Sequence, residues 1–328
     1  MPDTLAQPNA KPLSPSDLEA VIAIDMAASG SPRRGYFEKR LQAAIDNPRD
    51  YVFVGVFDGE ELAGFAFAKL DKGEFGKTGA SASLDAIGVN PDHGLQGIGH
   101  RLLEEVEKVL RHKGVTEFDS QVDWDQWPLL SFFAHSGFKM APRMVLTRTT
   151  REMPHELRDD PAANALELDY SSPDGDAGNA LSHDFVPVRS MRESDLAKII
   201  SIDAESSGSE RTDYFSRKQD EALNQSGVRV SLVAEQDGFP AGFIMARVDY
   251  GEFGRTSTEA VMDSIGVDTG FRGQGIGRFL MAKLMANLKA LQVETVRTEV
   301  DWNDIPLIGY FSSVGFRPAQ RISLSKPL

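Results

Sequence analysis

The chain has 328 residues, a formal net charge of −14 and no cysteine. Since a typical domain has ~100–200 residues, this length favours two domains. The lack of cysteine excludes disulfides, thiolate metal sites and a cysteine nucleophile. The acidic balance argues against a nucleic-acid partner, because phosphate binding needs clustered Lys and Arg.

The N-terminal stretch MPDTLAQPNAKPLSP is polar and rich in proline, unlike a signal peptide. No apolar run approaches the ~20 residues of a membrane span. We therefore expect a cytoplasmic protein without a membrane partner. Its 6 histidines are scattered without an H-x-x-x-H pair, so we predict no metal site.

Short peptides of the first half recur in the second half at a constant offset of 178 residues, as from Gly73 to Gly251. The recurring pairs are SGSPRRGYF and SGSERTDYF, GEFGKT and GEFGRT, QGIG at Gln96 and Gln274, DW at Asp123 and Asp301, and GF at Gly137 and Gly315. The period far exceeds that of solenoid repeats, so a whole domain is duplicated.

We predict domains at 1–150 and 185–328, joined by an acidic linker at 151–184. A tether raises the effective concentration of the two copies. We expect the two copies to pack against each other as a pseudo-symmetric dimer within one chain, so that no second chain is needed. Two domains that fold and act independently are the alternative.

Both copies predict the same order of elements. Two helical stretches come first, after Ser16 and Tyr36 in the first copy. Strands with hairpin turns follow, at Tyr51–Val56 and Leu62–Lys69, then Val228–Ala234 and Ala241–Val248. Each copy continues with a strand, a Gly-rich turn, an amphipathic helix, another strand, a Pro-initiated helix and a last strand.

The Gly-rich turn of the second copy lies between a strand ending at Val267 and a helix with apolar residues on one face. A glycine turn that opens a helix presents backbone N–H groups to an anion, without Cβ atoms to block its approach. A Walker loop requires Lys-Ser or Lys-Thr after its last glycine, but Arg278 and Phe279 follow Gly277 here. The glycines also begin too far from the strand for a Rossmann turn.

What remains is R-x-x-G-x-G at Arg272, Gly275 and Gly277, preceded by a strand and followed by a later Gly-Phe. This resembles the acyl-CoA pyrophosphate loop of the GNAT superfamily of N-acetyltransferases. The order of elements is also similar to the GNAT core, over nearly all of both halves. The resemblance implies two tandem α/β (α+β) domains, each with a mixed, mostly antiparallel sheet flanked by helices.

The resemblance implies acetyl-CoA, or another acyl-CoA, as cofactor. The residues expected to bind it are Val267, Arg272, Gly273, Gln274, Gly275, Ile276, Gly277 and Arg278, with Val89, Gln96, Gly97 and Gly99 in the first copy. Gly94 replaces Arg272 in the first copy, which removes a cation near the phosphates. We therefore favour the second copy as the catalytic one.

Many GNAT enzymes use a Glu on this strand as base, but Val261 occupies that place here. Strand periodicity would put Asp263 on one face with Val261, Ile265 and Val267. Asp263, matched by Asp85 in the first copy, is thus a candidate base or anchor for a substrate ammonium; the alternative is a structural carboxylate.

Many relatives also place a Tyr acid four residues before the Gly of Gly-Phe, where this chain has Phe311. Tyr310 is the neighbouring candidate, although a rotation of ~100° turns it elsewhere. The thiolate would otherwise leave without a dedicated acid.

The family generally sets specificity through its first helices, which implies Ser209, Arg211, Tyr214 and Glu252 as acceptor-binding candidates. The alternative is that these residues only cap and pack a pair of helices.

The predicted function is acetyl transfer to a small-molecule or peptide amine by direct attack in a ternary complex. A non-catalytic acyl-CoA-binding or regulatory protein is the alternative.

Overall fold

The computed structural model describes residues 9–71, 73, 79–94, 96–151, 186–220, 230–249, 253 and 258–328. The predicted linker, apart from Arg151, and the acceptor candidate Glu252 lie outside the described residues.

The elements of the first half are β1 (Asn9–Pro12), α1 (Leu18–Ser29), α2 (Arg34–Asp46), β2 (Tyr51–Asp58), β3 (Glu61–Asp71), β4 (Ser81–Val89), α3 (Ile98–His112), β5 (Glu117–Asp123), α4 (Trp127–His135) and β6 (Lys139–Thr149). Those of the second half are β7 (Val188–Ser190), α7 (Leu196–Ser207), α8 (Thr212–Asp220), β8 (Leu232–Gln236), β9 (Phe239–Asp249), β10 (Glu259–Val267), α9 (Ile276–Ala290), β11 (Thr295–Asp301), α10 (Ile305–Ser313) and β12 (Arg317–Pro327). The predicted order is confirmed, with two short edge strands, β1 and β7, in addition.

Local sequence explains where these elements end. Helices α1 and α7 stop at Gly30 and Gly208, which both adopt a left-handed φ of 75°. The second hairpin turns through Asp237 and Gly238, with φ of 53° and 79°, as the Asp-Gly pair predicts.

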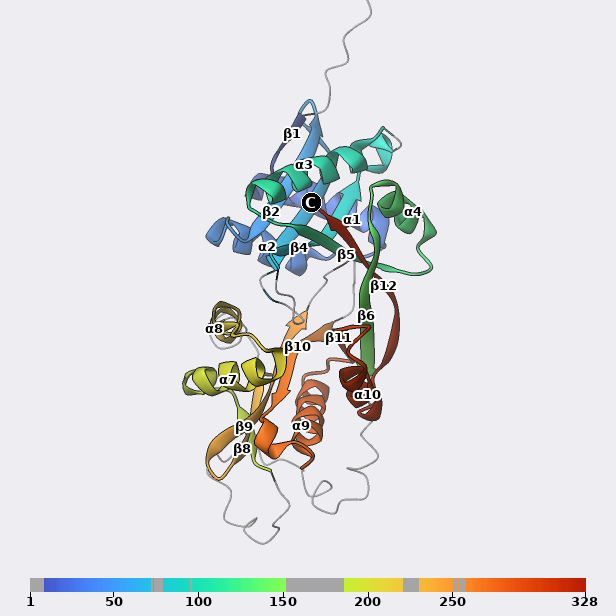
Figure 1. Cartoon of the computed structure of the whole chain (residues 1–328). Coiled ribbons are helices and arrows are strands. Elements are labelled where there is room, and N and C mark those ends of the chain that lie inside the picture. The colour runs from blue at the N-terminus through green and yellow to red at the C-terminus, as the bar shows by residue number, and fades with distance from the viewer. Residues whose placement is uncertain are drawn as a thin grey trace, which may run out of the picture.

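All strands join one 12-stranded sheet in the order β1-β2-β3-β4-β5-β12-β6-β11-β10-β9-β8-β7. The last strands are therefore exchanged between the halves. β12 pairs with β5, while β6 pairs with β11, and β6 and β12 lie side by side at the centre. In Figure 1 the red β12 runs up into the first half, where the C-terminus lies, and the green β6 runs down into the second.

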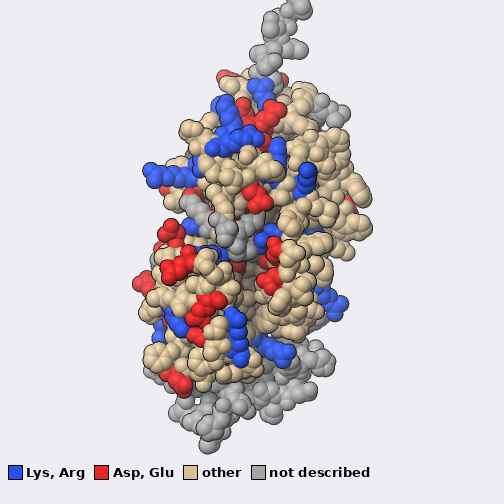
Figure 2. Space-filling model, viewed as in Figure 1, with Lys and Arg blue, Asp and Glu red and all other residues tan. Residues whose placement is uncertain are grey.

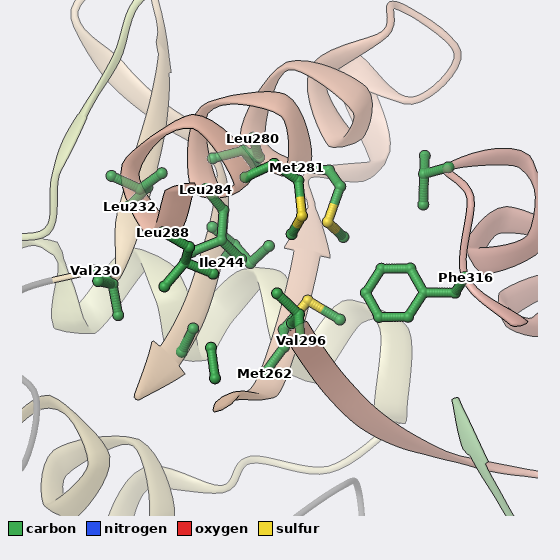
Figure 3. Packing of buried hydrophobic residues seen from close by; sticks show 14 of the residues in the cluster. Val230, Leu232, Ile244, Met262, Leu280, Met281, Leu284, Leu288, Val296 and Phe316 are labelled. Atoms are coloured by element: carbon green, nitrogen blue, oxygen red, sulfur yellow. The ribbon is translucent and has the colours of Figure 1, made fainter. Parts of the chain in front are cut away.

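The exchange also decides which side chains fill each core. Leu146 of β6 is buried among the apolar residues beneath α9, and Leu324 of β12 is buried among those beneath α3. Figure 3 shows Leu280, Leu284 and Leu288 of α9 above Ile244, Met262 and Val296 of the sheet. Neither core is complete without a strand of the other half, which explains the expected pseudo-dimer.

Helices cover both faces of each half-sheet. In the second half α9 packs on one face, and α7 and α8 pack on the other through Ile202, Phe215 and their apolar neighbours. The first half repeats this arrangement with α3 on one face and α1 and α2 on the other. The predicted mixed, mostly antiparallel sheet flanked by helices is confirmed.

Candidate active site

The sheet of each half opens where two parallel strands separate. β10 pairs with β11 only from Glu259 to Val261, although β10 continues to Val267. β4 and β5 likewise pair only from Ser81 to Ser83. Beyond these ladders the two strands diverge, so their backbone edges face a gap near the Gly-rich turn.

The Gly-rich turn connects β10 to α9 through a short 3-10 helix at Thr269–Phe271. Gly273 and Gly275 both have a φ of 80°, a conformation that side chains disfavour. The N–H groups of Arg278 and Phe279 donate to the carbonyl of Gly275, which starts α9. The first N–H groups of a helix have no acceptor within the helix. Those of Ile276 and Gly277 are therefore suited to bind an anion.

Side chains from α7 hold this turn in place. Asp268 accepts hydrogen bonds from the Lys198 ammonium at 2.6 Å and from the Gly270 N–H at 2.9 Å. These donors, Lys198 first, hold the pKa of Asp268 below its usual range. Arg272 donates from Nη2 to the hydroxyl of Ser206 at 2.8 Å, which keeps its cation beside the turn.

Tyr310 packs against the beginning of α9. Its hydroxyl donates to the Gly277 carbonyl at 2.8 Å, and a Cβ on Gly277 would lie 3.3 Å from its ring. Burial raises the pKa of the Tyr310 phenol above its usual range, so it stays a donor at neutral pH. In the first copy Phe132 packs against Gly99 in the same way, without a hydroxyl.

Asp263 lies in a β-bulge, because the register between β10 and β9 shifts between Met262 and Ser264. The expected common face with Ile265 and Val267 is therefore wrong. These two side chains pack against the core beneath α9, whereas Asp263 meets Lys218 of α8 on the opposite face. The extra residue of a bulge interrupts the alternation of side chains.

Two cations approach the same oxygen of Asp263. Oδ2 lies 3.5 Å from the Lys218 ammonium and 3.7 Å from Nε of Arg247. Oδ1 is buried and accepts no hydrogen bond from any residue within the described ranges. Asp85 occupies the equivalent bulge of β4, 3.3 Å from Arg40.

The sequence profile of the acetyltransferase (GNAT) family matches residues 18–138 and again residues 196–316. The chain belongs to the GNAT family of acetyltransferases. Both matched segments contain a Gly-rich turn and the strand before it. The chain is thus an acyltransferase built from two GNAT units.

Two relatives are named mycothiol acetyltransferase. That of Thermobispora bispora is 26% identical over 92% of this chain and 93% of its own length. That of Clavibacter sepedonicus is 30% identical over 112 residues, and the match spans 34% of both chains. Among the solved structures that share the fold is a GCN5-related N-acetyltransferase from Sphaerobacter thermophilus, with a TM-score of 0.60 and 17% identity over 100% of this chain and 96% of that one. Another is a tandem GNAT protein from the clavulanic acid biosynthesis pathway, with a TM-score of 0.62 and 17% identity over 98% of both chains.

Two of the predicted acceptor residues, Arg211 and Tyr214, lie at the boundary between the units. Arg211 forms a bidentate ion pair with Asp203, at 2.5 and 2.9 Å, and donates to the Gly73 carbonyl of the first unit at 2.7 Å. Tyr214 is buried with its hydroxyl 3.1 Å from Ser264, while Ser209 is exposed. Arg211 and Tyr214 thus both make polar contacts with other side chains or backbone groups of the protein.

The first GNAT unit retains the backbone turn but not the cation. Gly97, equivalent to Gly275, also has a left-handed φ, of 75°, and α3 starts directly after it. Gly94, where the second unit has Arg272, adopts an ordinary φ of −59°. Val89 pairs with Gly64, as Val267 pairs with Gly242, so the two strand ends are equivalent.

Sequence reasoning missed the cations beside the two aspartates. Arg40 and Lys218 are equivalent at the offset of 178 residues, so comparison of the halves for shared charge could have found them. It also missed Phe253 and Arg321, which enter a cavity of the first unit from the second half. Nothing local in the sequence indicates this crossing, because it depends on the exchanged strand.

Within the described part of the chain, no helix is long and apolar enough to cross a bilayer. No group of three His, Cys, Asp or Glu side chains is placed there to hold a metal ion.

Figure 2 shows acidic and basic side chains interspersed on one face, with acidic ones gathered over the half that carries α7 and α8.

Proposed function

We propose that this chain transfers an acetyl group from acetyl-CoA to an amine, and that the second GNAT unit is the catalytic one. The observation that carries the proposal is the turn from Arg272 to Arg278, with left-handed glycines before α9 and a cation held beside it by Ser206. These residues fit a diphosphate ester because backbone donors, a helix N-terminus and a guanidinium all favour an anion there. Use of acyl-CoA fits a cytoplasmic location.

The strand before the turn provides the second element of the site. Its ladder to β11 ends at Val261, while its other edge stays paired with β9 through Val267. The backbone facing the gap is therefore available to pair with the pantetheine arm. An N–H near Val267 would stabilise the oxygen that gains charge when the amine attacks.

Acetyl-CoA supplies the thioester whose carbonyl carbon the amine attacks directly in a ternary complex. We assign to Asp263 the role of contacting the acceptor amine, because its Oδ1 is buried and has no hydrogen-bond partner among the described residues. It either removes a proton from the amine or holds the ammonium before the proton is lost. Lys218 and Arg247 fix the carboxylate through Oδ2.

Tyr310 is assigned to position the cofactor turn, not to protonate the thiolate. Its hydroxyl proton is engaged by the Gly277 carbonyl, and its ring fills the space left by the missing Cβ. We therefore expect the thiolate to leave without a dedicated acid from this residue.

The acceptor is a small-molecule or peptide amine. The names of the relatives make the acceptor of the mycothiol acetyltransferases the first compound to test. Ser209, Arg211 and Tyr214, which lie where α7 ends and α8 begins, remain predicted neighbours of the acceptor, and so does Glu252.

The cofactor assignment is tested by titrating coenzyme A into wild-type protein and into Gly275→Val and Gly97→Val variants by calorimetry. A β-branched residue is strained at the left-handed φ of either glycine. We expect G275V to abolish binding at the second unit and G97V to leave it intact. Unchanged binding in G275V would refute the assignment.

A non-catalytic acyl-CoA-binding protein is the second candidate, favoured by the missing Glu and Tyr at their usual places. The same wild-type preparation separates the two, when thiol release is followed with a panel of amines. Rapid release of coenzyme A eliminates the binding-only candidate, whereas tight binding without release from any amine supports it.

A further inference from the structure

Two short segments expose the bulkiest apolar side chains of the chain. They cover residues 124–128, which join β5 to α4, and residues 302–306, which join β11 to α10, and all of these residues are exposed. The segments are equivalent at the offset of 178 residues, and all 3 tryptophans of the chain lie in them. We call them the tryptophan segments. Trp124, Trp127, Trp302 and Ile305 are 51, 67, 50 and 67% exposed.

The hydrophobic cores do not account for these four side chains. Helices α4 and α10 contact their cores through later positions, such as Phe133 and Phe311. None of the four exposed side chains is among the described residues packed against either core. Trp124 and Trp127 do not line the first unit's cavity either. A single exposed apolar residue is common, but two within four positions, repeated in both units, indicate an interaction surface.

The exchanged strands hold both segments in place. The Trp124 N–H donates to the Gln320 carbonyl of β12 at 3.2 Å, and the Trp302 N–H donates to the Pro142 carbonyl of β6 at 3.1 Å. In Figure 1, α4 and α10, which follow the segments, lie beside these two central strands. The backbone of each segment is therefore fixed before a partner arrives, which lowers the cost of ordering the surface on binding.

The charge of the segments favours a cationic partner. Asp125 lies between the two tryptophans of the first segment, Asp304 precedes Ile305 in the second, and neither segment contains Lys or Arg. Neither aspartate forms an ion pair with a residue that the structure describes. A cation is attracted both by such carboxylates and by the face of an indole ring. A second copy of this chain would instead bring a net charge of −14, which repels it.

We propose that the tryptophan segments bind a basic segment of a partner protein that also carries apolar side chains. Its Lys or Arg side chains lie against Asp125 and Asp304, and its apolar side chains cover the exposed indole rings and Ile305. Tryptophan rings provide the large apolar contacts that dominate binding at protein interfaces. The surface includes no residue of the cofactor turn, and binding to it does not require acetyl transfer.

The test uses three short peptides with blocked ends, titrated into the full chain without acyl-CoA. KLKLKLK carries positive charge and apolar side chains, KSKSKSK keeps the charge alone, and ELELELE keeps the leucines but reverses the charge. Because all 3 tryptophans lie in the segments, tryptophan fluorescence reports on this surface alone. Calorimetry gives the affinities.

A quadruple variant removes the apolar part of the surface by combining Trp124→Ser, Trp127→Ser, Trp302→Ser and Ile305→Ser. All four side chains are exposed, so folding should be preserved, and circular dichroism checks this. Phe239→Ser is the matched control, because Phe239 is also a large exposed apolar residue but begins β9, outside both segments.

We expect KLKLKLK to shift the tryptophan emission of wild type to shorter wavelength, and to bind the quadruple variant at least about tenfold more weakly than wild type and F239S. KSKSKSK and ELELELE should each bind wild type less tightly than KLKLKLK. No emission shift, or equal binding by the quadruple variant and F239S, overturns the surface. Equal affinity for KSKSKSK overturns the apolar contact, and equal affinity for ELELELE overturns the charge.

Binding of neutral phosphatidylcholine vesicles by wild type without binding of KLKLKLK would assign the surface to a lipid and overturn the peptide. Because G275V should still bind KLKLKLK, failure of this proposal is distinguishable from failure of the cofactor assignment.

Discussion

The hydroxyl of Tyr310 donates a hydrogen bond to the carbonyl of Gly277 at 2.8 Å, which joins α10 to the first turn of α9. The first unit has Phe132 in the equivalent contact with Gly99. The first unit therefore lacks this hydrogen bond at its Gly-rich turn.

Tyr310→Phe should weaken binding of coenzyme A by about two- to tenfold, since one hydrogen bond contributes ~0.5–1.5 kcal/mol. Calorimetry gives the affinity, and steady-state kinetics give kcat as a function of pH. A positioning role leaves the shape of the pH profile unchanged. Loss of its alkaline limb with unchanged affinity would instead identify Tyr310 as the acid.

Leu146→Ala and Leu324→Ala form a matched pair that tests the strand exchange. Leu146 belongs to the first half of the sequence but packs in the core of the second, and Leu324 does the reverse. Each truncation should lower the free energy of unfolding by roughly 2–5 kcal/mol. Hydrogen exchange should rise in β9 and β10 for L146A, and in β3 and β4 for L324A. The opposite pattern would show that each last strand stays with its own half.

Asp263→Asn and Asp85→Asn test which unit is catalytic. If Asp263 acts as the base, D263N should lower kcat by about a hundredfold or more at neutral pH while the affinity for coenzyme A is kept. A rise in KM alone would mark an ammonium anchor. D85N should leave turnover close to wild type, and a larger loss in D85N than in D263N would assign catalysis to the first unit.

Asp268→Asn tests the support of the cofactor turn by Lys198. The pKa of Asp268 is lower in the folded protein than in the unfolded chain, where it is ~3.9. The Asp268 carboxylate therefore stabilises the fold above pH ~3.9, and this stabilisation is lost as the pH falls through the folded-state pKa. Wild type should therefore be more stable than D268N at about pH 7, and the two should converge in strong acid. Denaturant unfolding at both pH values measures this, and a constant difference would exclude the linkage.

Comparison of the halves alone gave the duplication, the order of elements and the Gly-rich turn, because these depend on local patterns and on a fixed offset. Strand periodicity, in contrast, put Asp263 on one face with Ile265 and Val267, which is wrong. Periodicity assumes a regular strand, and a bulge adds a residue that only the pairing with β9 reveals. The aspartate itself was found, as a charged residue within an otherwise apolar strand.

The sequence by itself determined that two GNAT units exist and where each Gly-rich turn lies, since glycine turns and helix periodicity are properties of short segments. Only the tertiary structure decided that β6 and β12 change places and that Arg321 and Phe253 form a wall of the first unit's cavity. The two last strands share apolar residues at equivalent positions, Met144 with Ile322 and Leu146 with Leu324, so these positions do not tell which sheet each strand completes. The choice depends on contacts between residues far apart in the chain, which no local pattern records.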